Sequence, residues 1–131
     1  MTADGHRHSP GFLALVEEAR GGIRETDPHG VHTDLAAGED FHLIDVREDR
    51  EWKRGRIPGA VHIGRGVLER DIEKRLPDRA APIVLYCGGG YRSALAADSL
   101  ARMGYTQVRS MNGGYRGWTG AGYPVETDDH G

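Results

Sequence analysis

The segment from Pro82 to Met103 constrains the fold of this chain more than any other. It opens with the strand-forming run PIVLY, which a single Cys87 separates from three consecutive glycines, residues 88–90. The sequence SALAADSLARM follows and predicts a helix, with Ser93 as its N-cap and Gly104 just past its end. A strand, a glycine-rich turn and a helix in direct succession are typical of α/β domains.

The rest of the chain continues this alternation. Short apolar runs predict further strands at residues 23–26, 41–46, 60–63 and around Val108. Helical spacing or composition predicts helices at residues 12–19, 31–37, 48–54, 67–76 and 114–118. Because strands alternate with helices, we expect an α/β domain with a mainly parallel sheet.

The chain has 131 residues, the length of one domain. Residues 1–10 and 128–131 lack apolar periodicity and are expected to form a disordered N-terminal tail and a short polar C-terminal tail, which leaves a single domain at 11–127. We expect a cytoplasmic protein without membrane contact, because no apolar run approaches the ~20 residues of a membrane span and the first residues lack the apolar core of a secretory signal. The net charge of -3 and scattered basic residues argue against nucleic-acid binding.

Cys87, the only cysteine, opens the glycine-rich turn. A lone cysteine after an apolar strand is often just a small buried hydrophobic residue. Here its setting favours chemistry, because amide groups that converge at a helix N-terminus, together with the Arg92 guanidinium, would lower the ordinary thiol pKa of about 8.5 and favour the thiolate. The sequence therefore predicts a nucleophilic Cys87 surrounded by residues 88–92, and it predicts no metal or other cofactor.

The glycines do not fit a nucleotide-binding turn. Ser93 stands where the dinucleotide fingerprint requires its third glycine, and the lysine of a phosphate-binding P-loop is missing. A nucleotide ligand is therefore disfavoured.

Four motifs, taken together, resemble the rhodanese family of sulfurtransferases: LIDVRE at 43–48, GRIPGA at 55–60, YCGGGYRS at 86–93, and NGGYRGW followed by GYPV at 112–125. The resemblance covers residues 23–126 and implies a three-layer domain with a mainly parallel five-stranded sheet flanked by helices. It also implies that Cys87 carries a sulfane sulfur as a persulfide. The residues implied to bind it are Gly88, Gly89, Gly90 and Tyr91, with Arg92 closing the loop.

The length of this loop distinguishes two chemistries of the fold. Rhodaneses resemble one another in a six-residue loop, here Cys87 to Arg92, whereas related phosphatases have one residue more, so a phosphate-ester or arsenate activity is disfavoured. The loop departs from the family at Gly88 and Tyr91, because many members have charged residues at these two positions. With Arg92 as its only cation, the loop is expected to attract the thiosulfate dianion weakly, and Tyr91 is the candidate for substrate selectivity.

The reaction implied by the resemblance has two steps. A small anionic sulfur donor such as thiosulfate passes sulfur to Cys87, and a thiol or cyanide acceptor then removes it. The alternative is a persulfide carrier or docking module, in which Cys87 relays sulfur to a protein acceptor and small molecules turn over little.

Asp45 and Arg47 follow another predicted strand and are expected at the same sheet edge as Cys87. Two hypotheses remain open. In the first, Asp45 holds Arg92 or a loop amide while Arg47 shapes the entrance to the site. In the second, they form an ordinary ion pair that fixes the end of the strand.

Overall fold

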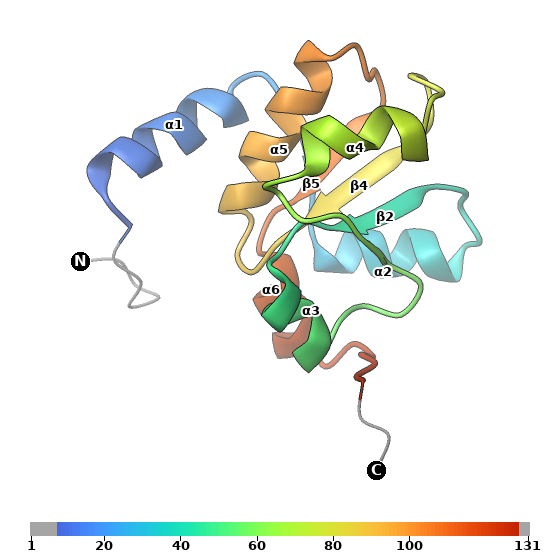
Figure 1. The fold of residues 1–131 in the computed structure, drawn as a ribbon. Coiled ribbons are helices and arrows are strands. Elements are labelled where there is room, and N and C mark those ends of the chain that lie inside the picture. The colour runs from blue at the N-terminus through green and yellow to red at the C-terminus, as the bar shows by residue number, and fades with distance from the viewer. Residues whose placement is uncertain (1–7, 129–131) are drawn as a thin grey trace.

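A single parallel sheet forms the centre of the protein, in a computed structural model that describes residues 8–128 (Figure 1). Its strand order is β1-β5-β4-β2-β3, and every neighbouring pair is parallel. The strands are β1 (Arg24–Thr26), β2 (His42–Asp45), β3 (Val61–His62), β4 (Ile83–Tyr86) and β5 (Val108–Met111). The helices are α1 (Pro10–Arg20), α2 (Pro28–Ala36), α3 (Asp49–Arg54), α4 (Leu68–Arg75), α5 (Tyr91–Arg102) and α6 (Gly114–Gly120).

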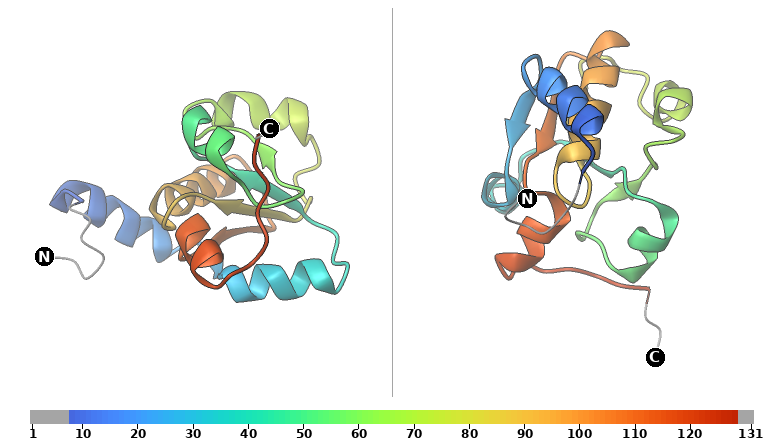
Figure 2. Two further views of the ribbon diagram at one scale, coloured as in Figure 1. Left: turned by 90° about the horizontal axis from the view of Figure 1, so that it is seen from below. Right: turned by 90° about the vertical axis from the view of Figure 1, so that its left-hand side faces the viewer.

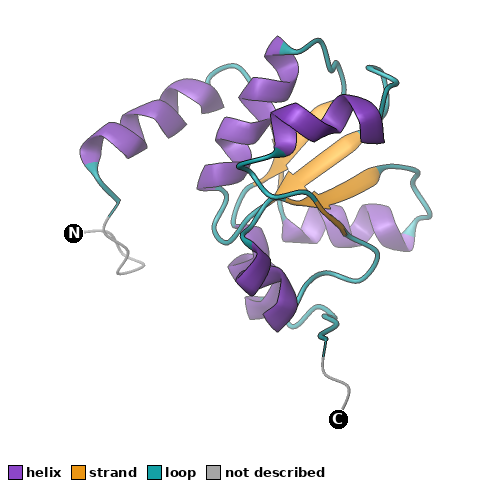
Figure 3. Cartoon of the chain, viewed as in Figure 1, coloured by secondary structure: helices purple, strands orange, loops and turns teal. Residues whose placement is uncertain are grey.

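Helices cover both faces of the sheet (Figures 2 and 3). Two apolar clusters make up the core, one on each face. Successive side chains of a strand point to opposite faces. Ile83 and Leu85 of β4 therefore pack in the cluster that includes residues of α4 and α5, whereas Val84 and Tyr86 pack with residues of α2 and α6. The expected three-layer α/β domain with five parallel strands is confirmed.

Helix α1 lies outside these layers and packs against α5 (Figure 1). It begins at Pro10, inside the stretch expected to be an unstructured tail, and the Phe12 amide donates to the Ser9 hydroxyl that caps the helix (3.4 Å). The remaining parts of the two expected tails, residues 1–7 and 129–131, lie outside the described residues.

All the predicted strands and helices are present, and the differences are at their ends. The clearest concerns α5, which begins at Tyr91 rather than after Ser93. Gly90 adopts φ +99°, a left-handed conformation that favours glycine, and it takes the N-cap position. Ser93 is therefore inside the first turn of α5, and its prediction as the N-cap is wrong.

The helices within residues 8–128 include none long and apolar enough to cross a membrane.

Candidate active site

Cys87 lies directly after β4 at the carboxyl edge of the sheet. Asp45, the last residue of β2, pairs in register with Tyr86, so the two parallel strands end side by side. The expectation that Asp45, Arg47 and Cys87 share one sheet edge is confirmed. This edge is where open parallel sheets commonly bind ligands.

Two backbone amides hold the Cys87 sulfur. The Gly90 amide donates to Sγ at 3.2 Å and the Ser93 amide at 3.3 Å. Only 1% of the residue is exposed, so these contacts lie where little water competes for the sulfur. Hydrogen bonds from N–H groups favour an anionic sulfur over a neutral one.

Ser93 contacts the sulfur through its side chain as well. Its hydroxyl lies 3.6 Å from Sγ and 2.8 Å from the hydroxyl of Ser110 on β5. Both serines are fully buried. Ser93, expected as a supporting residue through helix capping, instead lines the inner side of the sulfur site, and no sequence signal pointed to Ser110.

The first turn of α6 holds the backbone of the loop through two hydrogen bonds. The Tyr115 amide donates to the Cys87 carbonyl at 2.7 Å, and the Arg116 amide donates to the Gly88 carbonyl at 3.0 Å. Such contacts need a close approach of two backbones, and a Cβ on Gly114 would lie 2.6 Å from the Cys87 carbonyl oxygen. The glycine pair in the NGGYRGW motif therefore allows α6 to hold the loop.

Arg92 closes the loop by pairing with Glu51 of α3. The two guanidinium nitrogens Nη1 and Nη2 donate to the carboxylate oxygens at 2.8 and 3.2 Å. The hydrogen bond from Arg92 lowers the pKa of Glu51 to about 2, so this carboxylate is ionised at neutral pH. Sequence reasoning missed Glu51, which was visible only as the third residue of a capping box with Glu48.

Asp45 binds Arg47 and not Arg92. Its carboxylate accepts from the Arg47 side chain at 2.7 and 3.0 Å and from the Arg47 amide at 2.9 Å. Arg47 also donates to the Gly55 carbonyl at 2.6 Å, and its guanidinium lies 4.1 Å from the centre of the Tyr115 ring. Both charged residues are buried. Among the described residues, the hydrogen bonds of Asp45 go to Arg47 and not to Arg92 or a loop amide, so the structure favours the ion-pair hypothesis over the other one.

A pocket of about 440 Å³ opens onto Cys87. Its walls come from four parts of the chain, represented by Phe12 of α1, Glu51 of α3, Tyr91 in the loop region and Arg116 of α6. The Tyr91 ring faces Phe12 at 6.2 Å between ring centres, and the Arg20 guanidinium lies 5.1 Å from its centre. Tyr91 thus forms part of the pocket wall, where it could either select substrates or simply cover the site, and its role stays a prediction. Helix α1 adds a wall that the sequence did not reveal.

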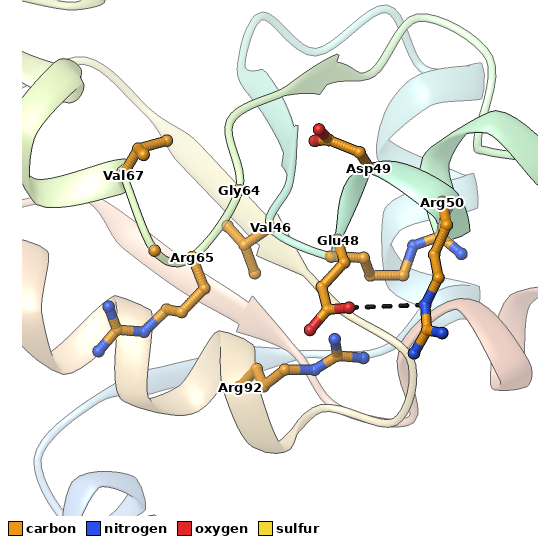
Figure 4. Close-up of a pocket in the computed structure, with 10 residues that line it drawn as sticks. Val46, Glu48, Asp49, Arg50, Gly64, Arg65, Val67 and Arg92 are labelled. Atoms are coloured by element: carbon orange, nitrogen blue, oxygen red, sulfur yellow. Dashed lines mark ion pairs between the residues drawn. The ribbon is translucent and has the colours of Figure 1, made fainter.

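A second pocket of about 730 Å³ adjoins the first, and the two share Glu48, Arg50 and Arg92 (Figure 4). Arg47 is among its lining residues. In Figure 4, Arg92 extends from α5 toward Glu48, which pairs with Arg50 at 3.6 Å. The site therefore holds more cations than the loop alone supplies. Among the described residues, no group of three or more His, Cys, Asp or Glu side chains is placed to hold a metal ion.

A parallel α/β sheet that presents a cysteine in a six-residue loop at its carboxyl edge is the arrangement that the rhodanese resemblance implies, and comparison with known proteins agrees. The sequence model of the family described as Rhodanese-like domain matches residues 29–121, and the chain belongs to this family. A relative named sulfurtransferase from Allochromatium vinosum is 31% identical over 103 residues, which are 79% of this chain and 94% of the relative.

Two solved structures are also similar. The polysulfide-sulfur transferase homodimer of Wolinella succinogenes is 30% identical, with a TM-score of 0.76 over 92% of this chain and 90% of its own. A Rhodopseudomonas palustris protein of unknown function, described as a possible tyrosine phosphatase, is 32% identical, with a TM-score of 0.81 over 92% of this chain and 98% of its own. The family and the relatives named for sulfur transfer support sulfur transfer as the general activity of this chain.

Proposed function

We propose that this protein moves a sulfane sulfur through a persulfide on Cys87. The Cys87 thiolate attacks the outer sulfur of an anionic donor such as thiosulfate. The sulfur–sulfur bond of the donor breaks, sulfite leaves with the electron pair, and Cys87 becomes a persulfide anion. Cyanide or a thiolate then attacks the terminal sulfur, which leaves as thiocyanate or a new persulfide, and the Cys87 thiolate is restored.

The observation that carries this proposal is the pair of amide hydrogen bonds on a buried sulfur. Donors fixed in advance by α5 stabilise negative charge on sulfur without reorganising during the reaction. The pocket in front of Cys87 has room for the terminal sulfur and for a small donor. Release to an external nucleophile follows from the sequence, since it contains no second cysteine.

The test is the mass of the protein after incubation with thiosulfate. We expect a gain of one sulfur atom that is absent in Cys87→Ser and that cyanide removes with release of one equivalent of thiocyanate. If neither thiosulfate nor an organic polysulfide loads the folded wild-type protein, the proposal fails.

The second candidate is a persulfide carrier that passes sulfur to a protein acceptor. The lack of a resolving cysteine favours it as much as it favours the enzyme, because both then depend on an external acceptor. Steady-state thiocyanate production separates them. Repeated turnover supports the enzyme, whereas clean loading with negligible turnover supports the carrier.

The likeness to a possible tyrosine phosphatase calls for a third measurement. Phosphate is bulkier than a single sulfur, and the arginine of this chain follows the cysteine by five positions, which gives the shorter loop. We therefore expect hydrolysis of p-nitrophenyl phosphate no faster than that by Cys87→Ser.

A further inference from the structure

We propose that Arg116 selects anionic sulfur donors by supplying, from α6, the positive charge that the loop itself lacks. The inference rests on the proposed function and deepens it, because it assigns the recognition of donor charge to one residue outside the loop.

The glycines of the loop make room for the Arg116 guanidinium. A Cβ on Gly89 would overlap Nη2 of Arg116, and a Cβ on Gly88 would lie 3.2 Å from Nη1. The guanidinium thus lies over the two residues that follow Cys87, where loop side chains would otherwise project. It is at the wall of the pocket that opens onto the sulfur.

The backbone holds the base of this side chain in place. The Arg116 amide donates to the Gly88 carbonyl at 3.0 Å, so the Cα from which the side chain starts is tied to the loop. A guanidinium presents planar, paired N–H donors that match the oxygens of a sulfonate-type group. Arg116 can therefore bind the oxygen-bearing end of a donor while its outer sulfur faces Cys87.

The other charges of the pocket are already paired. Glu51 binds Arg92 at 2.8 Å, and Glu48 lies 3.6 Å from Arg50. Within residues 8–128 no carboxylate lies within the 4.0 Å ion-pair distance of Arg116. Arg116 thus supplies the excess positive charge of the pocket, a cation that the sequence-based expectation of weak attraction for a dianion did not include.

The experiment measures the rate of persulfide loading from two donors of different charge. Thiosulfate carries two negative charges and methanethiosulfonate carries one, and both transfer their outer sulfur to a thiolate with release of sulfite or methanesulfinate. Because Coulomb attraction scales with charge, we expect Arg116→Gln at low salt to slow loading about tenfold with thiosulfate and about threefold with methanethiosulfonate.

Three further variants distinguish charge from structure. Arg116→Lys keeps the charge and is expected to recover most of the thiosulfate rate. Gly89→Ala keeps the arginine but displaces its guanidinium, and it should lower the thiosulfate rate more than the methanethiosulfonate rate. The matched control is Arg102→Gln, at the far end of α5 with a side chain 78% exposed, which should load as the wild type does.

The outcomes separate this inference from the proposed function. Wild-type rates in Arg116→Gln overturn the inference and leave the persulfide mechanism intact. An equal loss of loading rate with both donors also overturns it, because the arginine would then support the structure of the loop rather than distinguish donors by their charge. A wild-type protein that no sulfane donor loads defeats the proposed function itself, and the inference with it.

Discussion

Single residues at the sheet edge divide into those that touch the sulfur and those that hold the edge together. Asp45 and Arg47 belong to the second group, since their charges meet each other and the backbone near Gly55 rather than the Cys87 sulfur. Burial is the largest single influence and opposes charge on Arg47, but the hydrogen bond with Asp45 and the attraction of nearby negative groups, Asp45 foremost, together outweigh it, and the pKa of the guanidinium is raised above its usual value. Loss of either partner would leave a buried charge uncompensated.

We therefore expect Asp45→Asn to lower the free energy of unfolding by about 3 kcal/mol. Its rate of persulfide loading per folded molecule should stay within about twofold of wild type, because Asp45 does not contact the loop arginine. Urea denaturation and the loading assay measure the two effects. Asp34→Asn is the matched control, since its half-buried pair with Arg109 should contribute less than about 1 kcal/mol. A large loss of loading in folded Asp45→Asn would restore a functional role for this carboxylate.

At the scale of elements, α6 and the loop behave as one unit. The first turn of α6 binds two loop carbonyls, and its side chain at Arg116 covers two loop glycines. Gly114 makes this contact possible in two ways. Its φ of +60° is a backbone conformation that favours glycine. Its lack of a Cβ also allows the close approach to the Cys87 carbonyl, where a Cβ would not fit.

Gly114→Ala is expected to destabilise the protein by about 3 kcal/mol, because strain at positive φ adds to a backbone clash. It should also slow persulfide loading, since α6 can no longer fix the loop. Gly122→Ala separates the two causes. Gly122 has φ +79° but nothing within 4 Å of an added Cβ, so a cost of only about 1 kcal/mol and normal loading are expected. Thermal unfolding and mass spectrometry provide the readouts, and equal costs for the two variants would contradict the role given to the clash.

Across the whole molecule, the Glu51–Arg92 pair connects α3 to the start of α5, and both residues line the pocket. Glu51 has its pKa lowered from 4.5 to about 2, mainly by the hydrogen bond from Arg92. A lowered carboxyl pKa contributes stability that is present above the ordinary value and is lost as the pH falls through the folded-state value. This contribution therefore disappears between about pH 4.5 and pH 2.

We expect the difference in unfolding free energy between wild type and Glu51→Gln to shrink as the pH falls through that window. Denaturation at a series of pH values measures it. Glu17→Gln, on α1 and away from the pocket, controls for the removal of one negative charge from the surface. A wild-type advantage that stays constant from pH 6 to pH 2 would show that Glu51 is not stabilised as an ion by Arg92.

The sequence was sufficient to predict the succession of strands and helices along the chain. Hydrophobic runs such as 83–86 and the helical pattern after Gly90 depend on local conformational preferences, which can be read from neighbouring residues. It also identified Cys87 and Arg92 as candidate site residues, because both belong to one loop. It could not identify Glu51, Ser110, Phe12 or Arg116 as parts of the site. These side chains come from four other elements, and only the packing of those elements brings them to the site.

The pocket around Cys87 draws its walls from both ends of the described chain, from Phe12 near its beginning to Arg116 near its end. A ribosome-bound chain that has not yet emerged beyond the α5 region has the thiol but neither the α6 contacts that order its loop nor the cation proposed to attract donors. Sulfur uptake is thus expected to begin only after α6 has emerged and contacted the loop. A molecule that carries the extra sulfur would then also be one in which α6 has already packed against the loop.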